Sequence, residues 1–197
     1  AIAKIMIAAA KAALPGFPED AIQVVPTADR EAIPLLLGLT ELVDLCMPRG
    51  GEGLIRAVTA CSKVPVIKHY KGVCHVYVDK AADLAMAERI LLNAKVQRPG
   101  VCNAAETLLV HQSAAPTFLP MAAAALAGHH VELRADPAGL ALLHGYARMK
   151  PATAEDFKTE YNDLILNVAV VADTHGAIDH INANGSGHSD AIVTADN

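Results

Sequence analysis

Residues 93–111 read Asn-Ala-Lys-Val-Gln-Arg-Pro-Gly-Val-Cys-Asn-Ala-Ala-Glu-Thr-Leu-Leu-Val-His and join a helical pattern to a strand pattern. An amphipathic run over residues 83–95 predicts a helix, and Pro99-Gly100 ends it. Residues 107–110 form a short apolar run that is typical of a buried strand. Because this helix-to-strand order recurs along the chain, the sequence predicts an α/β fold with parallel strands.

Similar segments stand on both sides of this stretch. We expect Thr27 to cap one helix and Asp79 another, and we expect residues 146–155 to be an irregular polar connection. The predicted strands are residues 21–25, 43–47, 64–68, 74–78, 107–110, 131–134, 164–171 and 191–194. The predicted helices are residues 1–14, 27–37, 54–62, 79–95, 115–126, 138–143 and 174–182.

Composition narrows the class of protein. The chain has 197 residues, 53% of them hydrophobic, and a net charge of −5 without a basic block, which argues against nucleic acid as the main partner. The sequence contains no run of about 18 apolar residues, so it predicts no membrane span. Lys4 and Lys11 interrupt the first segment, so we interpret residues 1–14 as a helix and not as a signal peptide. The absence of an initiator methionine indicates a processed chain or a start within a larger protein.

Cys102 is the strongest candidate for chemistry. It follows a helix-to-strand break, downstream of Lys95 and Arg98, where cations favour a thiolate nucleophile. The alternative is a buried structural cysteine, since free cysteines are often buried. The other three cysteines lie in apolar or regular segments where we expect shielding, and no Cys-x-x-Cys pair occurs. This usage favours a reducing compartment, and we expect a cytoplasmic protein.

Eight short segments together resemble gamma-glutamyl phosphate reductase, also called glutamate-5-semialdehyde dehydrogenase, of the aldehyde dehydrogenase superfamily. They occur in the order of that family along nearly the whole chain. The segments are Pro48-Arg-Gly-Gly51, Gly72-Val-Cys-His-Val-Tyr-Val78, Lys95-Val-Gln-Arg-Pro99, the run from Cys102 to His111, Glu160-Tyr161, Ala177-Ile-Asp-His-Ile181, Gly185-Ser-Gly-His188 and Ala191-Ile-Val-Thr194.

The resemblance implies a function. It implies NADPH-dependent reduction of L-glutamyl 5-phosphate to L-glutamate 5-semialdehyde in proline biosynthesis, through a thioester on Cys102. It also implies an aldehyde dehydrogenase-like fold, with residues 1–69 as part of the nucleotide-binding domain and residues 70–197 as most of the catalytic domain. Both ends of the family pattern are missing, so we expect weak NADPH binding by this chain alone. A homo-oligomer and an association with glutamate 5-kinase are further implications.

Arg49, Gly50 and Gly51 stand between a predicted strand and a predicted helix, where glycines and helix amides can receive a phosphate. The alternative is an ordinary strand-to-helix turn. The resemblance favours contact with the nicotinamide dinucleotide, although the usual Gly-x-Gly-x-x-Gly pattern is absent.

Four further residues are candidates near the substrate. Lys95 and Arg98 could form a solvated helix end or bind the acyl phosphate, and Arg98 is preferred because guanidinium binds anions in a bidentate way. The backbone N–H groups of Cys102 and Asn103 could stabilise an oxyanion. His188 follows a Gly-Ser-Gly loop and could contact the substrate or a neighbouring subunit. We expect a structural role for Glu106.

The sequence predicts no metal site, because no His-Glu-x-x-His motif or Cys/His quartet occurs among the nine histidines and four cysteines. By resemblance, hydrolytic aldehyde dehydrogenases carry a general-base glutamate near the place of His69. Its absence here fits an acyl phosphate substrate, which needs no water-activating base. Two alternatives stay open: a superfamily member with a different acyl substrate, and a catalytically silent fragment or binding module.

Overall fold

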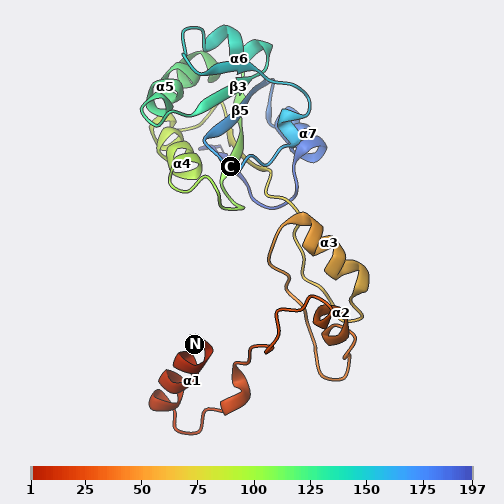
Figure 1. Ribbon diagram of the computed structural model, residues 1–197. Helices are drawn as coiled ribbons and strands as arrows, with labels where there is room; N and C mark the ends of the chain where they lie inside the picture. Colours follow the sequence, from red (N-terminus) through yellow and green to blue (C-terminus); the bar gives the residue numbers. More distant parts are fainter. Residues whose placement is uncertain (1, 197) are drawn as a thin grey trace. The chain divides into compact units, whose positions relative to one another are not determined.

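The computed structural model describes residues 2–196, and the chain divides into two compact units, Ala1–Lys68 and His69–Asn197 (Figure 1). None of the described helices is long and apolar enough to cross a membrane. The second unit contains the sheet and the large core, and the first contains short helices and a small core formed by Leu37, Val58 and Val64.

The second unit is built on one six-stranded sheet in the order β4-β3-β5-β2-β1-β6. Every strand pairing is parallel, which confirms the predicted α/β class with parallel strands. The strands are β1 (Cys74–Val78), β2 (Ala105–His111), β3 (Glu132–Ala135), β4 (Met149–Pro151), β5 (Ile165–Val171) and β6 (Asp190–Val193).

Helices cover both faces of this sheet, as parallel sheets require. They are α4 (Leu84–Val96), α5 (Ala115–Ala127), α6 (Pro137–Leu142) and α7 (Thr174–Asn184), with a 3₁₀ turn at η2 (Asp156–Lys158). Figure 1 shows α4 and α5 on one face and α7 on the other.

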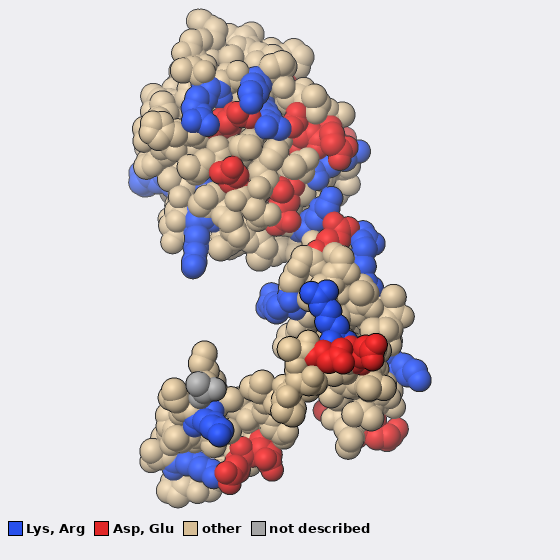
Figure 2. All heavy atoms as spheres, in the orientation of Figure 1, with Lys and Arg blue, Asp and Glu red and all other residues tan. Residues whose placement is uncertain are grey.

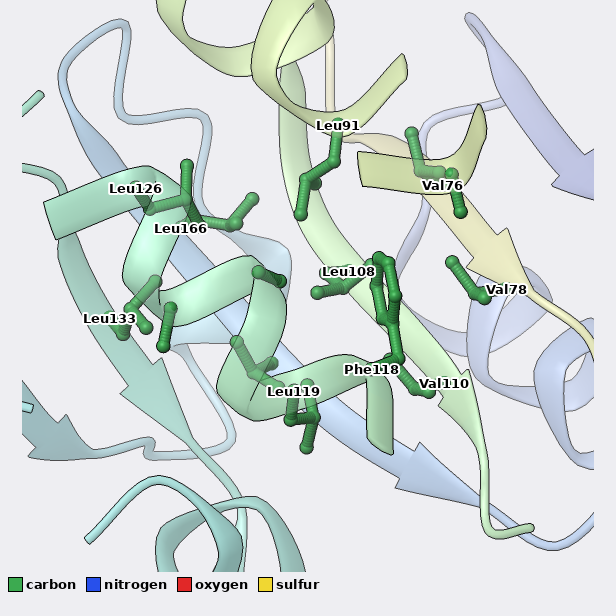
Figure 3. Close-up of a cluster of buried hydrophobic side chains, with 14 of the residues drawn as sticks. Val76, Val78, Leu91, Leu108, Val110, Phe118, Leu119, Leu126, Leu133 and Leu166 are labelled. Carbon is green, nitrogen blue, oxygen red and sulfur yellow. The ribbon is translucent and has the colours of Figure 1, made fainter. Parts of the chain in front are cut away.

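Successive residues along the central strands point to opposite faces of the sheet and pack in different hydrophobic clusters. Val76 and Val78 of β1 and Leu108 of β2 belong to one buried cluster with Phe118 and Leu119 of α5 (Figure 3). The alternate residues Tyr77, Leu109 and Ala169 pack on the other face against Ala177 of α7. The central strands are therefore buried on both sides, as is typical of a parallel sheet with helices on both faces.

Capping and edge details differ from the sequence predictions in this unit. The cap of α4 is Asp83, whose carboxylate accepts from Met86 N at 3.0 Å, and not Asp79. Asp79 is buried and accepts from the Tyr77 hydroxyl and from Thr194 Oγ1, so it joins β1 to the end of β6. The short edge strand β4 lies inside the segment that was predicted to be irregular.

The first unit departs most from the predicted elements. Its helices are α1 (Ile2–Ala13), η1 (Glu19–Ala21), α2 (Ala32–Leu36) and α3 (Glu52–Cys61). The strand predicted at residues 21–25 is wrong, and those at 43–47 and 64–68 are reduced to one parallel bridge, Cys46 to Val66. Thr27 caps no helix, because its hydroxyl accepts from Asp29 N ahead of α2.

A cluster of aromatic rings on the α7 side of the sheet is expected to make the stability of this unit depend on pH. His75 Nδ1 lies 2.8 Å from Asp190 Oδ1, and the His180 ring meets His75 and Phe157 edge-on. The Nε2 atoms of both histidines are buried and unpartnered among the described residues. Burial lowers the pKa of His75 and lowers that of His180 to about 4.

We therefore expect the unit to lose stability in mild acid. A histidine whose pKa is lower when folded binds more protons when unfolded, so stability falls as the pH drops through about 6.5 toward 4. We expect His180 to contribute a loss on the order of 2 kcal/mol. Urea unfolding across this pH range should show a shallower dependence in His180→Phe. The exposed His175→Gln serves as the control and should retain the original slope.

Candidate active site

The segments that enter β1, β6 and β2 meet at the amino-terminal edge of the parallel sheet. Val73 N, just before β1, donates to Ser186 Oγ at 3.0 Å in the loop before β6. Cys74 Sγ lies 3.3 Å from the carbonyl oxygen of Cys102 in the loop before β2. Residues that are far apart in the sequence therefore surround Cys102.

Cys102 and Asn103 are the central residues of a tight turn. Ala104 N donates to Val101 O at 3.0 Å and closes this turn. Both central residues are exposed, and within residues 2–196 their amide N–H groups donate to no protein acceptor. The turn therefore presents a thiol and two free backbone donors together, which is the combination that acyl-transfer chemistry uses.

Gly72 makes this turn possible. A Cβ on Gly72 would overlap the carbonyl oxygen of Cys102 and would lie 2.9 Å from Glu160 Oε1. Only a glycine leaves room for the Cys102 peptide at this point. The contact also places the carboxylate of Glu160 beside the turn, in the segment before β5.

A polar network holds the segment of Glu160. The hydroxyl of the next residue, Tyr161, lies 2.9 Å from both Asp156 Oδ1 and Asn167 Oδ1, and Asn167 is fully buried. Arg134 binds the same Asp156 carboxylate at 2.6 Å. Glu160 itself makes no hydrogen bond or ion pair within the described part of the chain.

His188 also lies near Cys74. Its Nδ1 is 2.8 Å from Ser189 Oγ and 3.8 Å from Cys74 Sγ, and its ring meets that of His69 edge-on with centroids 4.2 Å apart. Burial lowers the pKa of His188, and the neighbouring His69 adds to this effect. A neutral imidazole is thereby favoured next to Cys74, whose thiol contacts the Cys102 carbonyl.

Lys95 does not lie where the sequence placed it. Its side chain is fully buried, and Nζ lies 2.9 Å from Glu106 Oε2, which is also buried. Burial lowers the pKa of Lys95, and Glu106 opposes that change. Asn162 N donates to the other carboxylate oxygen at 3.3 Å. Lys95 is therefore neither a solvated helix end nor open to substrate, and the pair joins α4 to β2 beneath the turn.

Arg98 is exposed, and its carbonyl accepts from Val101 N at 3.3 Å, so it stands one turn ahead of Cys102. Arg49, Gly50 and Gly51 belong to the first unit, where they are exposed just ahead of α3. Gly51 caps that helix through its backbone alone, and Gly50 has a φ of +153°, which favours glycine.

The accessibility of the four cysteines corrects one expectation. Cys74 is buried and Cys46 is half-buried, but Cys61 is exposed like Cys102. Cys61 was expected to be shielded within a helix, and it is instead the last residue of α3. Position in a regular segment is thus a poor guide to burial at a helix end.

Charge does not mark the site on its own. Figure 2 shows acidic and basic side chains interspersed on the visible face of both units. Across the described residues, no group of three or more His, Cys, Asp or Glu side chains has the geometry to hold a metal ion. The site is therefore defined by Cys102, its backbone donors and the residues that hold its turn.

The sequence and the fold of the chain are similar to those of known proteins. No family model matches the chain. It is 55% identical over 182 residues to a gamma-glutamyl phosphate reductase of Geobacter metallireducens, covering 92% of this chain and 43% of the relative. A crystal structure of gamma-glutamyl phosphate reductase from Thermotoga maritima superposes with a TM-score of 0.85 at 39% identity, covering 98% of this chain and 46% of that one.

The fold extends to more distant proteins. An acetylating aldehyde dehydrogenase from Geobacillus thermoglucosidasius has a TM-score of 0.71 at 20% identity, over 98% of this chain and 50% of that chain. These findings confirm the resemblance to gamma-glutamyl phosphate reductase and the aldehyde dehydrogenase-like fold. The chain spans less than half the length of these two gamma-glutamyl phosphate reductases.

Proposed function

We propose that this chain carries the nucleophile, and part of the cofactor site, of an enzyme that reduces L-glutamyl 5-phosphate to L-glutamate 5-semialdehyde with release of phosphate. The observation that carries the proposal is the exposed Cys102 in a turn with two free amide donors. The 55% identity to gamma-glutamyl phosphate reductase supports the choice of substrate. NADPH, proline biosynthesis, a cytoplasmic location, a homo-oligomer and an association with glutamate 5-kinase follow from the resemblance and belong to the same proposal.

Cys102 begins the reaction. Its thiolate attacks the acyl carbon, the phosphate leaves with the electron pair of the broken C–O bond, and a thioester remains on the sulfur. During the attack, negative charge develops on the acyl oxygen. The amides of Cys102 and Asn103 are free to bind that charge, and one such donor is typically worth about 10²–10³ in rate.

The residues of the first unit fit a dinucleotide phosphate. Arg49 is exposed, and Gly50 and Gly51 lead into α3 without any side-chain cap on its first amides. An anion can therefore approach the helix N-terminus closely. Bound NADPH would supply the hydride that reduces the thioester. Collapse of the resulting thiohemiacetal releases the aldehyde and restores the Cys102 thiolate.

Two side chains of the second unit are proposed to meet the substrate. The exposed guanidinium of Arg98 can bind the acyl phosphate in a bidentate way. His188 is held by Ser189 near Cys74, and its lowered pKa keeps it neutral, so it can exchange a hydrogen bond with a polar group of the substrate. Lys95 is not expected to bind the substrate, because its buried ammonium group is paired with Glu106.

An exchange protein tests the function. In it, the matched segment of the Geobacter metallireducens relative is replaced by the residues of this chain. We expect NADP⁺ reduction by glutamate 5-semialdehyde only when phosphate is present, and at least about tenfold lower activity with succinate semialdehyde or acetaldehyde. The unmodified relative is the control.

Other outcomes identify the alternatives. A preference for a different aldehyde would identify another member of the superfamily. An inactive exchange protein that folds and binds NADPH like the control would identify a silent module.

A further inference from the structure

The carbonyl group of Cys102 points into the protein, toward β1. The buried Cys74 thiol donates to this oxygen across 3.3 Å, and Gly72 leaves the space that the carbonyl occupies. Gly72, just before β1, and Cys74, its first residue, therefore fix the position of a single peptide group. This peptide joins Cys102 to Asn103.

Peptide geometry links the direction of the Cys102 carbonyl to the direction of the Asn103 N–H. The described chain contains no cis peptide bond. In a planar trans peptide, the C=O of one residue and the N–H of the next point in opposite directions. If the carbonyl of Cys102 is directed inward to Cys74, the N–H of Asn103 is directed away from Cys74. That N–H is one of the two unpartnered amides of the turn.

We propose that Cys74 is a positioning residue for acyl transfer: its thiol holds the Cys102–Asn103 peptide so that the Asn103 N–H faces the acyl oxygen. This inference rests on the proposed role of Cys102 as the nucleophile. Cys74 touches no reacting atom and acts through the peptide that it orients.

The state of the thiol suits this role. Burial raises the pKa of Cys74 to about 11, so the S–H proton is present throughout the neutral range. His188 Nδ1 is a more distant neighbour of the sulfur, at 3.8 Å, so the carbonyl oxygen is the nearer acceptor. A thiol is a weak donor, but it needs only to hold a peptide that Gly72 already accommodates.

Two reagents that react with the Cys102 thiolate distinguish the orientation of the Asn103 N–H from the accessibility of the sulfur. p-Nitrophenyl acetate acylates the thiolate: a C–S bond forms, the C–O bond to p-nitrophenolate breaks, and charge develops on the acyl oxygen. Iodoacetamide alkylates the thiolate with loss of iodide and forms no oxyanion. Only the first reaction needs the Asn103 N–H in place. Neither needs the cofactor, so the 197-residue chain itself can be used.

The measurements use a Cys61→Ser background, in which Cys102 is the only fully exposed cysteine. We expect Cys74→Ala to slow acylation of Cys102 by about tenfold, less than the 10²–10³ typical of losing an oxyanion donor. Alkylation should change by less than about twofold. Cys74→Ser keeps a donor and should restore most of the acylation rate. Cys46→Ala is the matched control in the other unit and should change neither rate.

A methyl group at Gly72 tests the position of the same Cys102 carbonyl. Gly72→Ala forces the Cys102 carbonyl out of its place, so acylation should slow at least as much as in Cys74→Ala. Gly128→Ala is the control, because its added Cβ meets only Ala125 O at an ordinary 3.9 Å.

The outcomes distinguish this inference from the proposed function. Equal slowing of acylation and alkylation in Cys74→Ala, or a Cys74→Ser variant as slow as Cys74→Ala, would overturn the positioning role. Unchanged acylation in Cys74→Ala would do the same. A parent chain whose Cys102 is neither acylated nor alkylated would instead overturn the role of Cys102 as the nucleophile.

Discussion

Replacing Lys95 by methionine is expected to lower the free energy of unfolding of the sheet-bearing unit by about 3–5 kcal/mol. Lys95 and Glu106 are both almost completely buried, and their side chains are 2.9 Å apart. Methionine fills a similar volume but leaves the Glu106 carboxylate without its cation. Burial raises the pKa of Glu106, so the carboxyl would take up a proton more readily once Lys95 is gone.

Urea denaturation at pH 7 measures this effect, and two further variants interpret it. The double variant Lys95→Met with Glu106→Met removes both charges, and we expect it to recover most of the lost stability. Lys150→Met removes a cation whose side chain is 60% exposed, and we expect a change below about 1 kcal/mol. A Lys95→Met chain as stable as its parent would show that the buried pair does not hold α4 to β2.

Local pattern predicted most of the second unit correctly. The alternating residues 74–78 and the apolar residues at 107–110 and 164–171 marked β1, β2 and β5, and the amphipathic run before Pro99 marked α4. These signals succeed because a buried strand is a short apolar segment bounded by turn residues, whereas a helix buried on one face is longer and repeats its apolar residues every three to four positions. Lys95 was misplaced for a related reason. A lysine near a helix end usually meets water, and nothing local shows that Glu106, 11 residues later, lies inside the sheet.

The first unit shows where local pattern fails. Residues 43–47 and 64–68 have the apolar character of strands, yet only Cys46 and Val66 pair. A parallel strand needs hydrogen-bonding neighbours from elsewhere in the chain, and its own sequence does not specify them. The residues described here provide a single bridge.

The candidate site divides in a similar way. The family resemblance singled out Cys102 from its neighbours in the sequence. Gly72 and Cys74 belong to one of the segments that carry the resemblance, but the sequence assigned them no role beyond the beginning of a strand. Their contacts with the Cys102 carbonyl join segments about 30 residues apart. A glycine two residues before the predicted strand was the available signal, and its meaning depends on the fold.

Cys102→Ser is expected to abolish formation of the covalent intermediate while leaving the fold intact. The side chain is exposed, so the exchange of sulfur for oxygen removes little packing. Within the described chain, no basic side chain is hydrogen-bonded to Cys102 to activate a serine hydroxyl. We expect at least a roughly 10³-fold loss in acylation of the chain and in turnover of the exchange protein. Thermal unfolding should stay within a few degrees of the parent.

Peptide mapping after limited iodoacetamide treatment identifies the reactive thiol directly. Cys61 is the competitor, since it is exposed too, but its thiol donates to Val58 O at 3.5 Å at the carbonyl end of α3. A thiolate there would face carbonyl oxygens, whereas one at Cys102 stands beside free amides, so Cys102 should label first. Glutamate 5-semialdehyde with phosphate should protect Cys102 in the exchange protein but leave Cys61 open. Earlier labelling of Cys61, or normal turnover by Cys102→Ser, would remove the nucleophile from this turn and with it the thioester route.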